Sequence, residues 1–61
     1  MPHSFEDMRA CAEREAKMRR RVYPRWVEQK RMTQAQADRE TALMEAIESH
    51  FAELAGKERL L

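Results

Sequence analysis

The chain has 61 residues, a length that allows one domain at most. Charged residues make up 38% of it and hydrophobic residues 43%, with 12 Lys and Arg against 11 Asp and Glu. The single cysteine excludes an intrachain disulfide and a cysteine-based zinc site, and no apolar run is long enough to cross a membrane.

The composition predicts an all-α protein made of one helical domain, residues 1–61. Ala, Glu, Arg, Met, Gln and Leu dominate, and all of them favour helices. Val and Ile together number three, so strands have little support. The large apolar side chains are few for a chain that folds alone. We therefore expect a partner surface, most simply a second copy.

A first helix is predicted over residues 5–22. Ser4 precedes the acidic pair Glu6 and Asp7, and this order suits a helix N-terminus and its dipole. Apolar residues then recur at spacings of three and four, with Glu15 interrupting the stripe: Phe5, Met8, Cys11, Ala12, Met18 and Val22. The helix therefore presents a narrow apolar side.

Pro24 is expected to end this helix, because proline lacks an N–H and disfavours the helical conformation at Tyr23. Residues 24–31 then form a connector or a short second helix, with Trp26 turned toward the core. A kink inside one longer helix is the alternative. We expect Trp26 to anchor the fold, so that Trp26→Ala costs about 3–5 kcal/mol.

A second long helix is predicted over residues 34–55. Thr33 and Gln36 match a capping box, in which each side chain accepts a hydrogen bond from the other residue's backbone N–H. The apolar stripe contains the expected core residues, with Glu40 as the one polar intruder: Ala37, Leu43, Met44, Ile47, Phe51 and Leu54. Gly56 is placed as the residue after the helix, and residues 56–61 form a tail.

These elements predict an antiparallel helical hairpin that can dimerise into a bundle, with Trp26 at its closed end. Glu15 and Glu40 interrupt the two stripes. They either approach an Arg across the helix pair or subunit interface, or lie at the stripe edge in water, and we favour the second reading.

Positive charge is concentrated in the middle of the chain. Residues 17–33 carry seven cations against Glu28, whereas the segments on either side carry more acids than bases. The cations are candidate partner-binding or phosphate-binding residues: Lys17, Arg19, Arg20, Arg21, Arg25, Lys30 and Arg31. The alternative is a solvated surface whose cations complement the dipole of the first helix. A helix-turn-helix and a membrane-surface helix have weaker support.

No catalytic, cofactor-binding or metal-binding residues are predicted. The chain has no Gly-rich phosphate loop and no His-Glu-x-x-His pattern. His50 is expected at the edge of the apolar stripe, Cys11 is expected to be a small core residue, and His3 lies in the N-terminal segment. We expect no enzyme, no small-molecule substrate and no membrane association. Because no secretory signal is recognisable, a cytoplasmic location is expected.

Residues 19–47 resemble a segment of small uncharacterised proteins encoded by bacteriophages and prophages of Gram-negative bacteria. The residues that carry the resemblance are Val22-Tyr23-Pro24-Arg25-Trp26-Val27, Arg31-Met32-Thr33, Ala37, Glu40 and Met44-Glu45-Ala46-Ile47. The resemblance implies a phage accessory protein in the cytoplasm of the bacterial host and supplies no binding residues. Such relatives often have Gly before the Arg-Met-Thr, so Lys30 suggests a turn formed in another way.

Two functions are compatible with this pattern. The first is a phage-encoded accessory protein that acts by protein–protein binding, as a homodimer or on a larger partner. The second is a nucleic-acid-binding accessory protein that places the basic residues 17–31 on phosphates.

Overall fold

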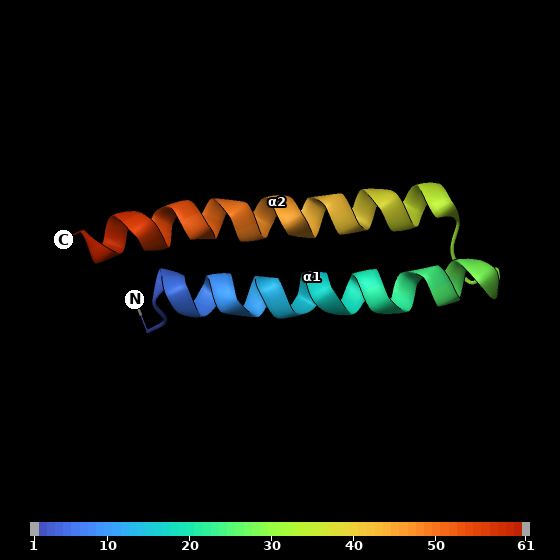
Figure 1. Cartoon of the computed structure of the whole chain (residues 1–61), viewed down its shortest axis with the longest axis horizontal. Helices are drawn as coiled ribbons and strands as arrows, with labels where there is room; N and C mark the ends of the chain where they lie inside the picture. The colour runs from blue at the N-terminus through green and yellow to red at the C-terminus, as the bar shows by residue number, and fades with distance from the viewer. Residues whose placement is uncertain (1, 61) are drawn as a thin grey trace.

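The structure, a computed structural model, describes residues 2–60, which form a hairpin of two antiparallel helices (Figure 1). Helix α1 spans Phe5–Glu28 and helix α2 spans Gln34–Arg59. The hairpin measures 47 × 16 × 16 Å. The first turn of α1 and the last turn of α2 meet at its open end, and the turn of residues 29–33 forms its closed end (Figure 1). The predicted all-α helical hairpin is confirmed.

Both helices begin where the sequence places their caps. The Ser4 hydroxyl accepts a hydrogen bond from the Asp7 backbone N–H at 3.0 Å. At the start of α2, Thr33 Oγ1 accepts from the Gln36 N–H at 3.1 Å, and Gln36 Oε1 accepts from the Thr33 N–H at 2.9 Å. The predicted capping box is therefore confirmed, and it satisfies two backbone donors that the helix itself leaves unpaired.

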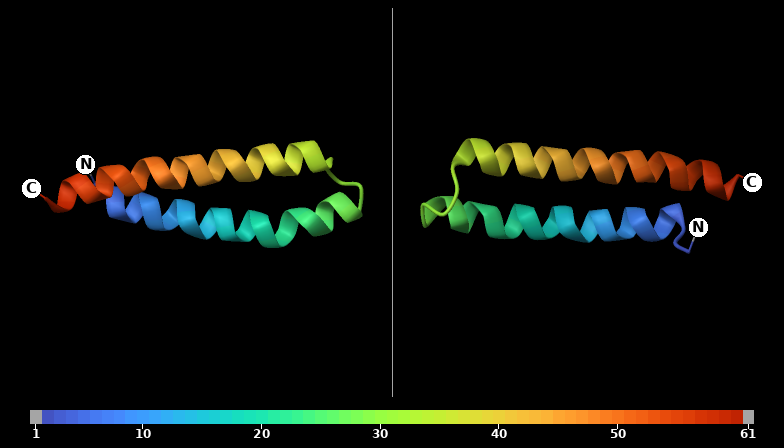
Figure 2. Two further views of the ribbon diagram at one scale, coloured as in Figure 1. Left: turned by 45° about the horizontal axis from the view of Figure 1, so that its top comes forward. Right: turned by 180° about the vertical axis from the view of Figure 1, so that it is seen from behind.

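The predicted end of the first helix at Val22 is wrong, because α1 continues through Pro24 to Glu28. Of the two alternatives, the longer helix is the correct one. Proline still removes the helical hydrogen bond to the Arg20 carbonyl, and α1 changes direction in its C-terminal third (Figure 2). The added turn brings Trp26 against the Tyr23 ring, with ring centroids 5.5 Å apart.

The closed end is a Schellman motif with a lysine in the left-handed position. Lys30 has a φ of 62°, a conformation that glycine adopts without steric cost. Its N–H donates to the Val27 carbonyl at 3.0 Å, and the Arg31 N–H donates to the Trp26 carbonyl at 2.8 Å. Lys30 thus takes a conformation that favours glycine.

The second helix also extends beyond its predicted end at Ala55. Gly56 lies inside α2, without a positive φ, and the helix ends at Arg59. The added turn contacts α1, because the Phe5 N–H donates to Glu58 Oε2 at 3.4 Å. Of the predicted tail, Leu60 is 87% exposed, and Leu61 lies outside the described residues.

The helices meet along a seam of alanines rather than along their large side chains. The buried residues of the described chain are Ala12, Ala16, Ala37 and Ala55. Small residues let two helices approach closely, and this closeness pushes larger side chains to the flanks of the contact. The expected anchors Trp26, Met44, Phe51 and Leu54 are accordingly only partly buried. The prediction of Ile47 as a core anchor is wrong, since it is 42% exposed.

Candidate functional site

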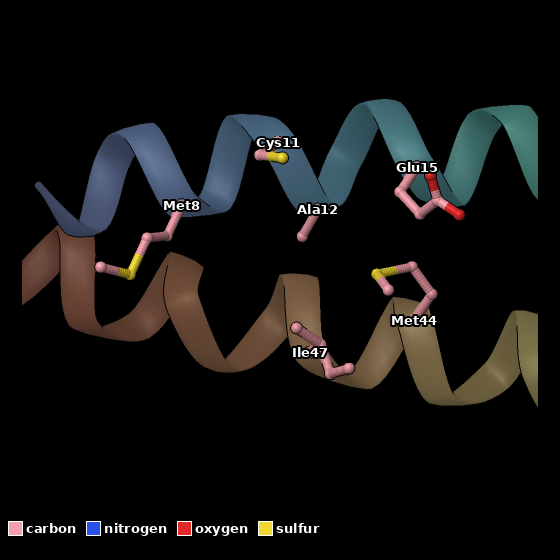
Figure 3. Close-up of a pocket in the computed structure, with 6 residues that line it drawn as sticks. All are labelled: Met8, Cys11, Ala12, Glu15, Met44 and Ile47. Carbon is pink, nitrogen blue, oxygen red and sulfur yellow. The ribbon is translucent and has the colours of Figure 1, made fainter. Parts of the chain in front are cut away.

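An open apolar groove runs along one side of the hairpin. Met8, Cys11 and Ala12 of α1 and Met44 and Ile47 of α2 line it, together with Glu15, and it encloses about 330 Å³ (Figure 3). The side chains of Met8, Ala12 and Met44 point into the gap between the helices (Figure 3). Cys11 is exposed, so the prediction of a core cysteine is wrong for the hairpin by itself.

Further apolar side chains extend this groove along both helices. Leu43 is 45% exposed, and helical spacing places it on the same side of α2 as Ile47 and Leu54. On α1, the spacings between Met8, Cys11 and Met18 likewise place these residues on one side. We call this set the apolar face: Met8, Cys11, Met18, Leu43, Ile47 and Leu54.

The opposite side of the hairpin is polar. Arg20 lies nine residues from Cys11, which is half a turn around the helix axis, and its guanidinium binds the Glu45 carboxylate of α2 at 2.6 Å. Arg9 binds Glu6 at 2.8 Å and Glu13 at 2.5 Å. The hairpin as a unit is therefore amphipathic, with an ion-paired side and an apolar side.

The ion pairs of Arg9 favour the charged forms of Glu6 and Glu13. Hydrogen bonds from the Arg9 guanidinium are the largest cause that lowers the pKa of Glu6 and of Glu13 below the ordinary value of 4.5. A hydrogen bond from Lys17 lowers the pKa of Glu13 further. The two carboxylates raise the pKa of Arg9 in turn. This row of charges is exposed to solvent, so it marks the water-facing side.

Arg19 joins the two helices at the border of the apolar face. Its Nε lies 3.0 Å from Glu15 Oε1, and its Nη1 donates to the Glu40 backbone carbonyl at 2.8 Å. The Glu40 carboxylate is 3.8 Å away, and the Arg19 side chain is only 18% exposed. Glu40 thus approaches an Arg of the other helix, against the interpretation that we favoured, whereas Glu15 pairs with Arg19 of its own helix, which neither interpretation described.

The seven candidate cations divide into two groups. Lys17, Arg19 and Arg20 form ion pairs with carboxylates along the hairpin. The other four form no ion pair with residues 2–60, and they belong to the last part of α1 and the turn: Arg21, Arg25, Lys30 and Arg31. The structure therefore does not join all seven in one site.

Aromatic rings accompany the cations of the closed end. The Arg31 guanidinium lies 4.9 Å from the centroid of the Trp26 ring, a cation–π distance. Arg19 lies 5.9 Å from the centroid of Tyr23. Trp26 therefore lies at the closed end as predicted, and the contact with Arg31 takes the place of the hydrophobic contact usual in a Schellman motif.

The other titratable candidates do not gather. His50 is exposed and contacts Phe51 edge to face, with ring centroids 5.5 Å apart, in agreement with its predicted place beside the stripe. No group of three His, Cys, Asp or Glu residues within positions 2–60 is arranged to hold a metal ion. Neither helix in this range is long and apolar enough to span a bilayer.

Comparisons of the chain with protein-family models, with curated proteins and with solved structures give no match.

Proposed function

We propose that this chain is a protein-binding module that acts without catalysis, and that its apolar face is the binding surface. The observation that carries the proposal is that the hairpin fully buries only alanines, whereas Leu43 and Ile47 remain 45% and 42% exposed. Contiguous exposed apolar side chains on a small protein are characteristic of an interaction surface. Removing the exposed part of each from water contributes about 1 kcal/mol.

The structure offers rigid support for such a surface. Ion pairs within α1 and between Arg20 and Glu45 stabilise the polar side, while the alanine seam fixes the spacing of the helices. The resemblance of residues 19–47 to phage and prophage proteins supports a role as a phage accessory protein in the host cytoplasm.

The test compares two charge insertions on opposite sides of the hairpin. Ile47→Lys alters the apolar face, and Ser49→Lys, at an exposed position of the same helix, is the matched control. Each tagged chain is crosslinked in a bacterial lysate and its attached proteins, including further copies of itself, are identified by mass spectrometry. The proposal requires partners that are lost in Ile47→Lys and kept in Ser49→Lys. Identical partner lists for all three chains contradict it.

A second candidate function is nucleic-acid binding by the closed end. It is favoured by the four cations there that form no ion pair with described residues, next to the rings of Tyr23 and Trp26. Phosphate contacts would make the affinity fall steeply with salt. A gel-shift titration with duplex and single-stranded DNA and RNA, at low and at physiological salt, tests it. Absence of binding at low salt removes this candidate.

A further inference from the structure

We infer that a second copy of the chain covers the apolar face, and that the two hairpins lie antiparallel about a two-fold axis close to Ile47. This inference rests on the proposed function and names its partner. The product is a four-helix bundle in which α1 lies against α1 of the other copy and α2 against α2. Each closed end then lies toward the open end of the other copy.

The single hairpin lacks the core that a chain of this size needs. No side chain larger than alanine is fully buried among residues 2–60, and domains this small bury little apolar surface alone. A second amphipathic hairpin supplies the missing layer, as in four-helix bundles. The hairpin measures 47 by 16 Å on the side that carries the apolar face, so a second copy that covers this side has about 750 Å² available, close to the roughly 800 Å² per partner of a stable complex.

The charge distribution favours a second copy in the antiparallel orientation. Residues 5–16 of α1 carry two Arg against four acids, whereas residues 17–28 carry five cations against one acid. Because Ala12 of α1 lies level with Ile47 (Figure 3), antiparallel packing about this axis places residues 17–19, which include Lys17 and Arg19, beside residues 5–7 of the other copy, which include two acids. This contact is attractive. A parallel dimer would instead bring the unpaired cations of both closed ends together.

The side chains of the apolar face also match their own copy. With the axis at Ile47, this residue meets its equivalent, while Leu43 comes opposite Phe51, a ring beside the apolar face that contacts Phe5 of α1. On α1 the axis passes near Ala12, which lies level with Ile47 across the groove (Figure 3). Met8 then comes near Met18 of the other copy. Methionine adapts its shape to an irregular contact, and Glu15 stays paired with Arg19.

Two measurements test the inference. Sedimentation equilibrium of the unmodified chain over a hundredfold range of concentration gives the mass, and the expected result is twice that of the 7.3 kDa monomer. The orientation is tested by oxidising Ile47→Cys in a Cys11→Ser background. Facing cysteines at a two-fold axis reach disulfide distance, so a covalent dimer is expected. Ser49→Cys in the same background is the control and is expected to remain uncrosslinked.

The mass tests whether the partner is a second copy, and the crosslinking tests the antiparallel orientation. A monomeric mass at every concentration, with helical circular dichroism intact, overturns the second copy as partner. In that case the proposed protein-binding function still stands if Ile47→Lys loses a lysate partner. Failure of the second-copy inference can therefore be distinguished from failure of the proposed function. A dimeric mass in which Ile47→Cys does not crosslink, or in which Ser49→Cys crosslinks equally well, overturns the antiparallel orientation.

Discussion

Replacing Lys30 with glycine should stabilise the hairpin. Among the non-glycine residues of positions 2–60, Lys30 alone has a positive φ, at 62°. A side chain in this conformation places its Cβ too close to the following carbonyl oxygen. Its backbone hydrogen bonds, from the N–H groups of Lys30 and Arg31, do not involve the side chain. The substitution therefore removes the steric cost and keeps the turn.

The size of the effect follows from two opposing contributions. The left-handed conformation costs a residue with a Cβ about 1–2 kcal/mol, whereas glycine loses about 0.5–1 kcal/mol more backbone entropy on folding. The net gain in the free energy of unfolding is about 0.5–1 kcal/mol. For a chain of this size the gain corresponds to an increase in Tm of about 2–8 °C.

The measurement is thermal and urea unfolding followed by circular dichroism, at one fixed protein concentration because association would shift the midpoint. Lys30→Ala is the control, since it removes the same positive charge and keeps the Cβ. We expect the unfolding midpoints of Lys30→Gly to be higher than those of both the unmodified chain and Lys30→Ala. If the glycine variant is no more stable than the alanine variant, the steric argument for this turn is wrong.

Three further substitutions or conditions probe the rest of the hairpin by the same unfolding assay. Pro24→Ala restores a helical hydrogen bond inside α1 and should stabilise the chain by about 2–3 kcal/mol; an unchanged midpoint would mean that the bend in α1 carries no cost. Thr33→Ala removes the capping hydroxyl and should cost about 1 kcal/mol, whereas Thr33→Ser should cost much less; equal losses would contradict the capping role. The pKa values of Glu6 and Glu13 are lower in the folded chain than the ordinary value of 4.5. The two carboxylates therefore stabilise the folded chain above pH 4.5, and this stabilisation is lost as the pH falls through their pKa values in the folded chain. Urea midpoints between pH 7 and pH 2 should therefore decrease below pH 4.5, and Glu13→Gln should flatten that decrease; an equal slope in the variant would show that these ion pairs do not contribute.

The helix starts could be predicted from the sequence because they depend on a few adjacent residues. Ser4 with Asp7, and Thr33 with Gln36, form their hydrogen bonds within one turn of chain, so no distant contact is needed to place them. The chain reversal between the helices was predictable for the same reason. Once α2 begins at Gln34, two long helices with a short connection must fold back.

The helix ends could not be predicted in this way, because contacts formed beyond Pro24 and Gly56 offset the preference of these residues to end a helix. Pro24 disfavours a helix, yet the turn after it is closed by the Schellman hydrogen bonds and by stacking of Arg31 on Trp26. Gly56 favours an end, yet the Glu58 carboxylate in the following turn accepts a hydrogen bond from the start of α1. Both exceptions are stabilised by contacts that periodicity does not reveal.

The proposed binding surface was only partly predictable. Apolar spacing identifies the sides of the helices that turn toward each other, but it does not show that the contact closes on alanines and leaves Ile47 exposed. The seven cations were grouped because they are close in sequence. The helical arrangement instead directs Lys17 and Arg20 to carboxylates.

The alanine seam has a consequence for how entropy is divided between folding and association. Alanine has no rotamers to lose when it is buried, so closing the hairpin restricts few side-chain torsions. The methionines and leucines beside the seam keep much of their freedom until something packs on them. If a second copy docks as proposed, folding of the single chain and docking are therefore limited by the ordering of different groups, and the ordering of the long side chains belongs mainly to the docking step.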